Sequence, residues 1–514
     1  MQNFWQAASG WGDANNAKRL PAPALLLVAL FSFLCMMFVF PVWAFCGDEG
    51  FFALAGRNVL RGMRPYRDFL FIQMPLLAYV YAAWFAIVPA SIQAGRFLAA
   101  IMATAGVLLS ASAANRAGSK RAAMFTVMLW LSSVHVASDL TAIKTQSLCH
   151  LLICAAMYFL ARMQDSHRLF WAAAAMFAMS LGFFTRMTLL FPLVLLWIYL
   201  AFEFRQRIAP YLIFLTANMV FLVGALWFFW SEGRMWFGVY VTHHDFYGAA
   251  PWTWGRLLWT IRGWLGNQLI ITFVFAFAII CFISQAADRR NWARLAFPSY
   301  LLASYWVVCL AHWTTVQNYP THHTTITPFA VVFSALMLHP LLDALTPGQV
   351  RLAVASFVVA SAIAQPLNEI SLGERFVRSE KPDMFDEAVS ILRQHAPAGD
   401  TLLTFNVELA LNGNYNVYPG CEMSDWSYMA TVPDNLAERY HLLNFHRLKA
   451  ALREGKTTIL TLVDRDFSIM AMGNPDAAKE LKSLIDERYY NVGVVKRYGQ
   501  FGQDLLIFKR LDAP

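Results

Sequence analysis

Two adjacent carboxylates, Asp48 and Glu49, stand directly after the first long apolar stretch of the chain. Carboxylates beside a bilayer are costly, which favours a functional role. The residues that follow have helical spacing, so the pair lies at a helix N-terminus, where a carboxylate stays ionised. An ionised, positioned carboxylate can act as a general base. The same position also explains Asp48 as a helix N-cap with Glu49 in the first turn, and the two interpretations are compatible.

A second pair of charged residues, Asp139 and Lys144, flanks a gap between two later apolar segments. Each charge would be expensive inside lipid. The two side chains could simply pair with one another across the gap, or Asp139 could belong to the same site as Asp48. Both alternatives stay open from the residues alone.

The elements that must position these residues belong to a membrane protein. Of the 514 residues, 58% are hydrophobic and 14% are charged, and the mean hydropathy is +0.46. Soluble domains contain about a quarter charged residues. Residues 24–45, 209–230 and 263–287 contain no Asp, Glu, Lys or Arg, and each exceeds the about 20 residues of a membrane span. Most of the chain therefore cannot fold in water.

Apolar stretches recur over residues 1–370 and predict about 11 to 13 transmembrane helices. The spans cover roughly residues 23–44, 75–91, 96–114, 121–138, 145–161, 169–185, 187–203, 209–230, 264–286, 295–311, 326–343 and 352–367.

Basic residues in the connections predict which ends of the spans face the cytoplasm. They occur at residues 116–121, 162–168, 205–207 and 289–294, and Lys18 and Arg19 precede the first span. This orientation leaves Asp48 and everything after about residue 370 on the outer side. The net charge of +8 fits such loops and lipid headgroups rather than nucleic acid.

One inconsistency concerns the stretch between Asp48 and Arg116. An odd number of crossings must separate an outer Asp48 from an inner Arg116, yet two apolar segments lie between them. Either residues 75–114 do not form two full spans, or one basic loop departs from the rule.

Residues 48–62 predict an amphipathic helix in the first outer loop. Phe51, Phe52 and Leu54 belong to its apolar side, Arg57 and Arg61 lie one turn apart on its polar side, and Gly62 is suited to end it. Such a helix is expected to lie at the membrane interface.

After about Glu374 charged residues become frequent and long apolar runs stop. Helices are predicted at residues 383–394 and 477–489, and strands at residues 401–405, 457–463, 492–495 and 504–508. The chain thus divides into a transmembrane domain, residues 1–370, and a small outer α/β or α+β domain, residues 371–514.

The first part of the chain resembles the GT-C glycosyltransferases. The shared features are the first span, Asp48-Glu49, the amphipathic helix, Gly62, Pro65-Tyr66-Arg67-Asp68, Gln73-Met74-Pro75 and an apolar run to Arg96. Within that class the chain is most similar to the protein O-mannosyltransferase and lipid A aminoarabinose transferase branch. It is also similar to bacterial enzymes that add sugars to lipopolysaccharide core. The resemblance is strong over residues 24–200 and mainly architectural beyond.

The resemblance implies roles for individual residues. The family's proposed catalytic base, an Asp of the first outer loop, corresponds to Asp48, and its acidic neighbour to Glu49. A second acidic position at the outer end of a later helix corresponds to Asp139. A basic position after the sixth apolar segment corresponds to Arg186, where relatives frequently have Lys, and either residue can hold a phosphate.

The implied reaction moves a sugar from a polyprenyl-phosphate carrier to an acceptor hydroxyl with inversion of the anomeric centre. A carboxylate takes the hydroxyl proton, and cations stabilise the leaving phosphate. Expected substrate contacts are Arg186, Lys144, Tyr66, Arg57, Arg61 and His243. Anchoring to lipid headgroups is the alternative for the arginines of the first outer loop.

The histidines leave two further alternatives. His243 and His244 could bind a divalent cation together with Asp48 or Glu49, although adjacent histidines point in different directions. No cofactor is otherwise implied, and some relatives use a metal while others do not. His322 borders another outer loop and could contact donor phosphate or acceptor, or be an interfacial residue.

The implied partners are a polyprenyl-phosphate sugar donor, a lipid- or protein-linked acceptor such as lipopolysaccharide, and membrane lipids, without nucleic acid. The expected location is the bacterial inner membrane, with the active site and the C-terminal domain on the periplasmic side. A transporter or flippase of lipid-linked sugars is the alternative function, but transporters usually have repeated halves and this sequence has no internal repeat. A glycan polymerase or ligase is a third option.

Overall fold

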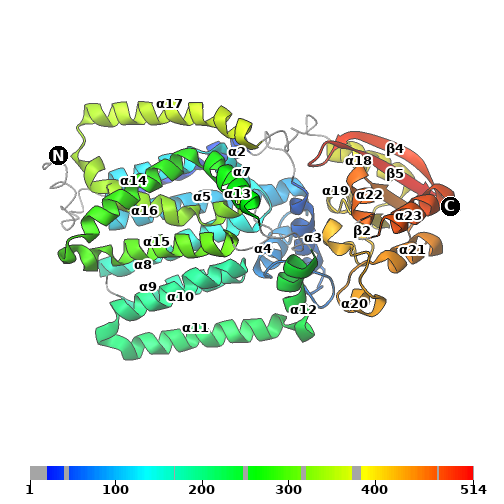
Figure 1. Ribbon diagram of the computed structural model, residues 1–514, viewed down its shortest axis with the longest axis horizontal. Coiled ribbons are helices and arrows are strands. Elements are labelled where there is room, and N and C mark those ends of the chain that lie inside the picture. The colour runs from blue at the N-terminus through cyan, green and yellow to red at the C-terminus, as the bar shows by residue number, and fades with distance from the viewer. Residues whose placement is uncertain are drawn as a thin grey trace.

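The computed structural model joins a bundle of long helices to a smaller α/β domain, with helix α3 (Asp48–Leu60) between them (Figure 1). This is the predicted fold class. The structure describes residues 20–39, 46–166, 168–246, 253–313, 320–372, 384–455, 457–471 and 474–512.

In the described part of the chain, ten helices make up most of the bundle. They are α2 (Ala22–Val39), α5 (Ile92–Ala117), α8 (Thr145–Ser166), α9 (Leu169–Phe183), α10 (Leu190–Glu203), α11 (Ile208–Phe229), α14 (Leu269–Ala286), α15 (Trp292–Trp313), α16 (Thr327–Ala344) and α17 (Pro347–Leu372). Among the described residues, seven helices are long and apolar enough to cross a membrane, or eight if one bent pair is a single span. Four shorter apolar helices accompany them, so the number of about 11 to 13 spans stays a prediction.

Shorter elements connect the long helices. They are α4 (Leu76–Phe85), α6 (Lys120–Leu131), α7 (Val134–Thr141), η2 (Met187–Leu189), η3 (Arg205–Arg207), η4 (Ser231–Gly233), α12 (Arg234–Trp236), the π-helix η5 (Phe237–Phe246), α13 (Trp254–Asn267), η6 (Arg289–Asn291) and η7 (Pro320–Thr325).

The length of α4 resolves the inconsistency between Asp48 and Arg116. Its 10 residues extend about 15 Å, half of the hydrocarbon thickness, so the predicted span 75–91 is too short to cross. Helix α5, with 26 residues, is long and apolar enough to cross alone. One crossing is an odd number, which places Arg116 at the opposite end of the bundle from Asp48. There Arg116 pairs with Asp165 at 3.0 Å.

The predicted span 121–138 is broken. Helices α6 and α7 meet at an angle of 82°. Ser133 has an extended backbone between them, and its hydroxyl accepts a hydrogen bond from Val136 N, which caps α7. The Ser132 hydroxyl bonds back to the carbonyl of Leu129 at the end of α6. Two serines therefore provide the partners that a break between apolar helices requires.

Helix α3 is enclosed rather than laid on a membrane surface. Its residues from Glu49 to Asn58 are all buried, including those of the polar side. Gly56 allows contact with α4, since an added Cβ would lie 2.6 Å from the Cβ of Tyr81, and Gly50 similarly allows contact with Glu408 of the C-terminal domain. Gly62, at φ +88°, turns the chain after the helix as predicted.

The C-terminal domain contains one mixed sheet in the strand order β2-β1-β3-β5-β4. Parallel pairs join β1 to β2 and β3, and antiparallel pairs join β5 to β3 and β4. Its elements are α18 (Met384–His395), β1 (Thr401–Thr404), α19 (Glu408–Gly413), β2 (Asn416–Val417), η8 (Ser424–Ser427), α20 (Asp434–Arg439), α21 (Phe445–Glu454), β3 (Ile459–Leu462), α22 (Asp464–Met470), α23 (Pro475–Arg488), β4 (Tyr489–Tyr498) and β5 (Gln503–Arg510). The loops at one end of this sheet face α3 (Figure 1).

Candidate active site

Asp48 is the first residue of α3, and its side chain is exposed. Gly47, rather than Asp48, is the N-cap, so the predicted capping role is wrong. In the described part of the chain no hydrogen bond or ion pair engages the Asp48 carboxylate. Desolvation by the surrounding protein raises the pKa of this carboxyl above the ordinary value, while the positive charge of Lys144 opposes the increase.

Glu49 differs from Asp48 in its burial, its hydrogen bonds and the direction of its pKa shift. It is fully buried, and its carboxylate accepts hydrogen bonds from Arg96 Nε at 2.7 Å and Nη2 at 2.5 Å. The backbone N–H groups of Cys46 and Ile143, each at 3.1 Å, complete its partners. Burial alone would raise the pKa of Glu49, but the Arg96 charge and these bonds lower it. Glu49 thus connects α3, α5 and the loop that follows α7.

That loop brings Lys144 to Asp48. Ile143 is fixed by Glu49, and Lys144 is the next residue along the chain. Lys144 Nζ lies 3.8 Å from Asp139 Oδ1, and Thr324 donates a 2.8 Å hydrogen bond to the other oxygen of Asp139. Although burial would lower the pKa of Lys144, the nearby acidic groups, Asp139 and Asp48 among them, raise it, so the ammonium stays charged.

Arg186 adds a second cation next to Lys144. Its Nη1 donates a 3.2 Å hydrogen bond to the hydroxyl of Thr145, the residue that follows Lys144. In the described residues no carboxylate pairs with Arg186. Burial, with Arg186 nearby, holds the pKa of His322 well below its usual range, so this histidine is neutral. Lys144, Arg186 and His322 together can bind an anion through charge and N–H groups.

The C-terminal domain closes the other side of the site. Gln500 Oε1 accepts a 3.1 Å hydrogen bond from Gly47 N, directly before Asp48. Arg465 and Asp425 pair at 2.8 Å, and both act electrostatically on Asp48. The sequence did not identify these residues, because nothing in a polar loop distinguishes a residue that will face a site nearly 400 positions earlier.

Three residues predicted to contact substrate make hydrogen bonds within the protein. Arg57 is buried and donates a 2.7 Å hydrogen bond to the carbonyl of Ala410. Arg61 donates to the side chains of Asn416 and Asn414 at 2.9 and 3.3 Å. Both arginines therefore hold the C-terminal domain on α3. Tyr66 is buried, and its hydroxyl bonds to the carbonyl of Gln73 within the segment between α3 and α4.

The adjacent histidines do not form a metal site with the carboxylates. His243 donates from Nε2 to the carbonyl of Ile72 at 2.9 Å, and its ring lies 5.2 Å from that of Trp426. His244 is exposed and stacks on Tyr240 instead. Within the residues that the structure describes, no group of three or more His, Cys, Asp or Glu side chains could hold a metal ion.

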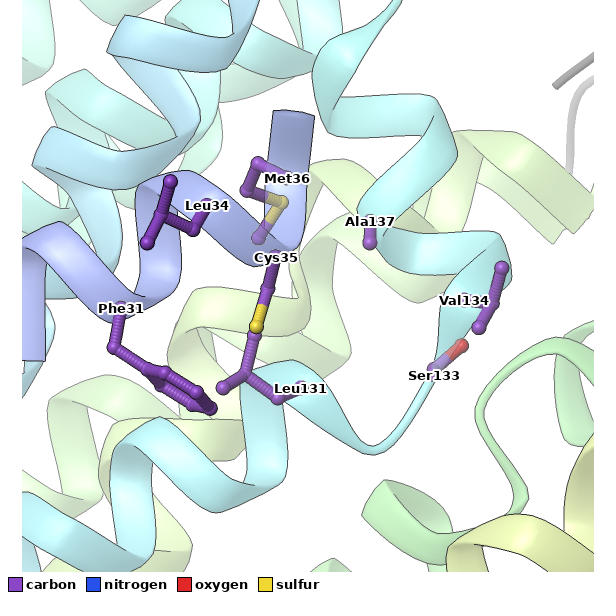
Figure 2. Close-up of a pocket in the computed structure, with 8 residues that line it drawn as sticks. All are labelled: Phe31, Leu34, Cys35, Met36, Leu131, Ser133, Val134 and Ala137. Atoms are coloured by element: carbon purple, nitrogen blue, oxygen red, sulfur yellow. The ribbon is translucent and has the colours of Figure 1, made fainter. Parts of the chain in front are cut away.

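An apolar cavity of about 400 Å³ lies between α2 and the break between α6 and α7 (Figure 2). Its walls are Phe31, Leu34, Cys35 and Met36 on α2, and Leu131, Ser133, Val134 and Ala137 at the break. Phe31 and Leu34 are more than half exposed, so the α2 wall reaches the surface of the bundle. Ala137 lies two residues before Asp139 on α7. The cavity can therefore hold a hydrocarbon chain close to the polar site.

The comparisons with known proteins agree with this geometry. Residues 73–230 match the family model described as dolichyl-phosphate-mannose-protein mannosyltransferase. No curated protein matches the chain in sequence. The structure of ArnT from Cupriavidus metallidurans bound to undecaprenyl phosphate has a TM-score of 0.61 and 13% identity, covering 94% of this chain and 97% of that one.

Two further structures share the fold. ArnT from the same organism in the apo state has a TM-score of 0.60 and 12% identity, covering 94% of this chain and 98% of that one. The Archaeoglobus fulgidus oligosaccharyltransferase tethered to an acceptor peptide has a TM-score of 0.51 and 11% identity, covering 96% and 74%. At such identities the likeness shows the fold. Together with the family model, it confirms the predicted resemblance to GT-C glycosyltransferases of this branch and the predicted class of enzyme.

Proposed function

We propose that the chain transfers a sugar from a polyprenyl-phosphate carrier to a hydroxyl acceptor, with Asp48 as general base. One observation carries this proposal: of two adjacent carboxylates, Glu49 has four hydrogen bonds and Asp48 has an open carboxylate next to Lys144. A base needs a free oxygen within reach of the proton that it removes. Asp48 meets this requirement, whereas Glu49 and Asp139 position the loop and the lysine around it.

Lys144 and Arg186 are proposed to bind the phosphate of the donor. Thr145 follows Lys144 in the chain and accepts a hydrogen bond from Arg186, which connects the two cations. Their charges are fixed before substrate arrives, so they can stabilise the negative charge that develops on the departing phosphate without reorganisation. Neutral His322 can add a ring nitrogen to this set.

In the proposed step, one bond forms and one bond breaks at the anomeric carbon of the sugar. The acceptor oxygen attacks the anomeric carbon while Asp48 takes its proton. The bond between the anomeric carbon and the phosphate oxygen breaks, and polyprenyl phosphate leaves with the electron pair. Attack from the side opposite the phosphate inverts the anomeric centre.

The apolar cavity supports a lipid donor. A cavity lined almost entirely by hydrocarbon, beside the helix that carries Asp139, suits the isoprenoid chain next to the phosphate. The crystal structure of ArnT bound to undecaprenyl phosphate shows that a protein of this fold binds such a lipid.

The alternation of basic connections supports an outer placement of the site. We propose the bacterial inner membrane as the location, with Asp48 and residues 371–514 on the periplasmic side. The acceptor proposed on this side is lipopolysaccharide or another envelope glycolipid.

The test is Asp48→Asn, which keeps the size of the side chain and removes the base. We expect the sugar-modified product to fall at least about 100-fold while the carrier-linked sugar accumulates. The measurement is mass spectrometry of lipids from cells that lack the native gene and express each variant. Asp68→Asn is the matched control, since Asp68 lies in the same outer loop and pairs with exposed Arg67.

Retained transfer by folded Asp48→Asn would contradict the mechanism. Translocation of the carrier by a wild-type protein that transfers no sugar would support the flippase instead.

A further inference from the structure

A tight turn of the C-terminal domain carries an acid that acts electrostatically on Asp48 and an aromatic side chain that contacts His243. The turn is η8, and it contains Asp425 and Trp426. Ser424, which precedes them, has a φ of +57°, a conformation that non-glycine residues adopt only when their surroundings enforce it. Its hydroxyl bonds to the carbonyl of Phe405 at the end of β1, and Met423 N bonds to the Ser427 hydroxyl at 2.8 Å. The direction of Asp425 and Trp426 is therefore fixed by the fold.

Each side chain of the turn is held from a second element. Arg465 of α22 pairs with Asp425 at 2.8 Å, and the guanidinium lies 4.5 Å from the centre of the Phe501 ring. Trp426 meets the ring of His243 on η5, while His243 itself bonds to Ile72 of the first outer loop. Trp426 is only partly buried. One turn thus joins the C-terminal domain, η5 and the loop around Asp48.

We infer that Asp425 and Trp426 form the acceptor subsite and bind a sugar ring that carries the attacking hydroxyl. An aromatic face packs against the C–H groups of a pyranose. In a paired carboxylate and guanidinium, the carboxylate accepts hydrogen bonds from neighbouring hydroxyls and the guanidinium donates hydrogen bonds to them. The inference rests on the proposed function and names the substrate class of the same site.

The residues proposed to bind the donor and those proposed to bind the acceptor come from different domains around Asp48. Lys144 and Arg186, which are proposed to bind the donor phosphate, belong to the membrane bundle. Asp425 and Arg465 act on Asp48 from the C-terminal domain. Inverting displacement requires the attacking hydroxyl opposite the leaving phosphate, so the side facing the C-terminal domain receives the acceptor.

A sugar fits this surface better than a peptide. Extended peptides are commonly recognised by main-chain hydrogen bonds to an exposed sheet edge. Here a side-chain pair acts on Asp48, and the aromatic ring on the same tight turn contacts His243. A protein acceptor is nevertheless an outcome that the test distinguishes.

The test compares Trp426→Ala, Trp426→Phe and Asp425→Asn in the full-length protein. We expect Trp426→Ala to reduce the glycolipid product at least about tenfold, as removal of an aromatic anchor does, and Trp426→Phe to retain most of it. Asp425→Asn should also lose product. All three should bind undecaprenyl phosphate in nanodiscs as the wild type does, whereas Arg186→Gln should bind it more weakly. Trp292→Ala, at an exposed tryptophan on the opposite end of the bundle, is the control.

Three results would overturn the inference. They are unchanged product with Trp426→Ala, weakened binding of undecaprenyl phosphate in the same variant, or a sugar-modified protein in place of a glycolipid. The proposed function fails separately, when Asp48→Asn retains transfer.

Discussion

At the scale of single residues, neighbouring carboxylates have opposite environments. Asp48 is open and has a raised pKa, whereas Glu49 is buried, fully bonded and has a lowered pKa. The sequence placed both in the candidate site but could not separate their roles. The separation depends on Arg96 and on the N–H of Ile143, which only the fold brings to Glu49.

The charge of Lys144 should be visible in the pH dependence of transfer. A base acts only when it is ionised, so activity falls as the pH drops through the pKa of Asp48. Because desolvation raises that pKa, the decline should occur above about 3.9, the ordinary value for aspartate. Lys144 lowers the same pKa, so Lys144→Met should move the acidic limb of kcat/KM to higher pH.

The measurement is the complete pH profile of each variant in nanodiscs. Arg116→Met, at the other end of the bundle, should leave the limb in place. A limb that moves to lower pH in Lys144→Met would contradict the proposed role of Asp48.

At the scale of elements, the local sequence pattern predicted which helices exist more reliably than where each helix ends. The helix after Asp48, its turn at Gly62 and the apolar content of α6 and α7 could be read from neighbouring residues. The short length of α4 and the 82° break could not, because apolar residues continue through both. Ser132 and Ser133 do mark the break, but two serines are ordinary within a membrane span.

The cavity beside the break between α6 and α7 allows a test of where the donor lipid binds. Leu34→Trp on the exposed wall of the cavity, or Ala137→Leu on its buried wall, should occupy space proposed for the isoprenoid chain. We expect a higher KM for the carrier-linked donor with kcat largely retained, since no group at the polar site changes.

Steady-state kinetics at varied concentrations of the carrier-linked donor will measure KM and kcat for each variant. Ala209→Phe adds an apolar group to an exposed position of α11 and serves as the control. An unchanged KM in both cavity variants would show that the lipid chain lies elsewhere.

At the scale of the whole molecule, two domains share α3. Arg57 and Arg61 reach from this helix to the C-terminal domain, and Glu408 packs back against Gly50. The sequence predicted the two domains and most strands of the second. It assigned the arginines to substrate or headgroups because their partners, Ala410 and Asn416, have no local signature.

Buried acids make the stability of this assembly depend on pH. Burial raises the pKa of Glu408, Glu422 and Asp466 to about 7 each. A carboxyl whose pKa is higher in the folded state contributes stability that is complete below its unfolded pKa and is lost as the pH rises through about 7. The Tm should therefore decrease between about pH 5 and pH 7 and level off above that range.

Glu408→Gln should reduce that decrease, because glutamine keeps a partner for Tyr498 and cannot ionise. Thermal unfolding in detergent at several pH values provides the measurement. Glu480→Gln on the exposed side of α23 is the control, and a Tm that rises with pH would contradict the assignment.

The contact between Arg57 and Ala410 also has a consequence for biosynthesis. The two residues are 353 positions apart, so at about 5–20 residues per second the ribosome needs on the order of 20 to 70 seconds between them. Through that interval α3 is translated and delivered to the membrane without the domain that will cover it. The helix that begins with Asp48 can reach its final surroundings only after nearly the entire polypeptide has been made. A chain interrupted before residue 410 therefore lacks the part of the C-terminal domain that packs against the helix of the proposed base.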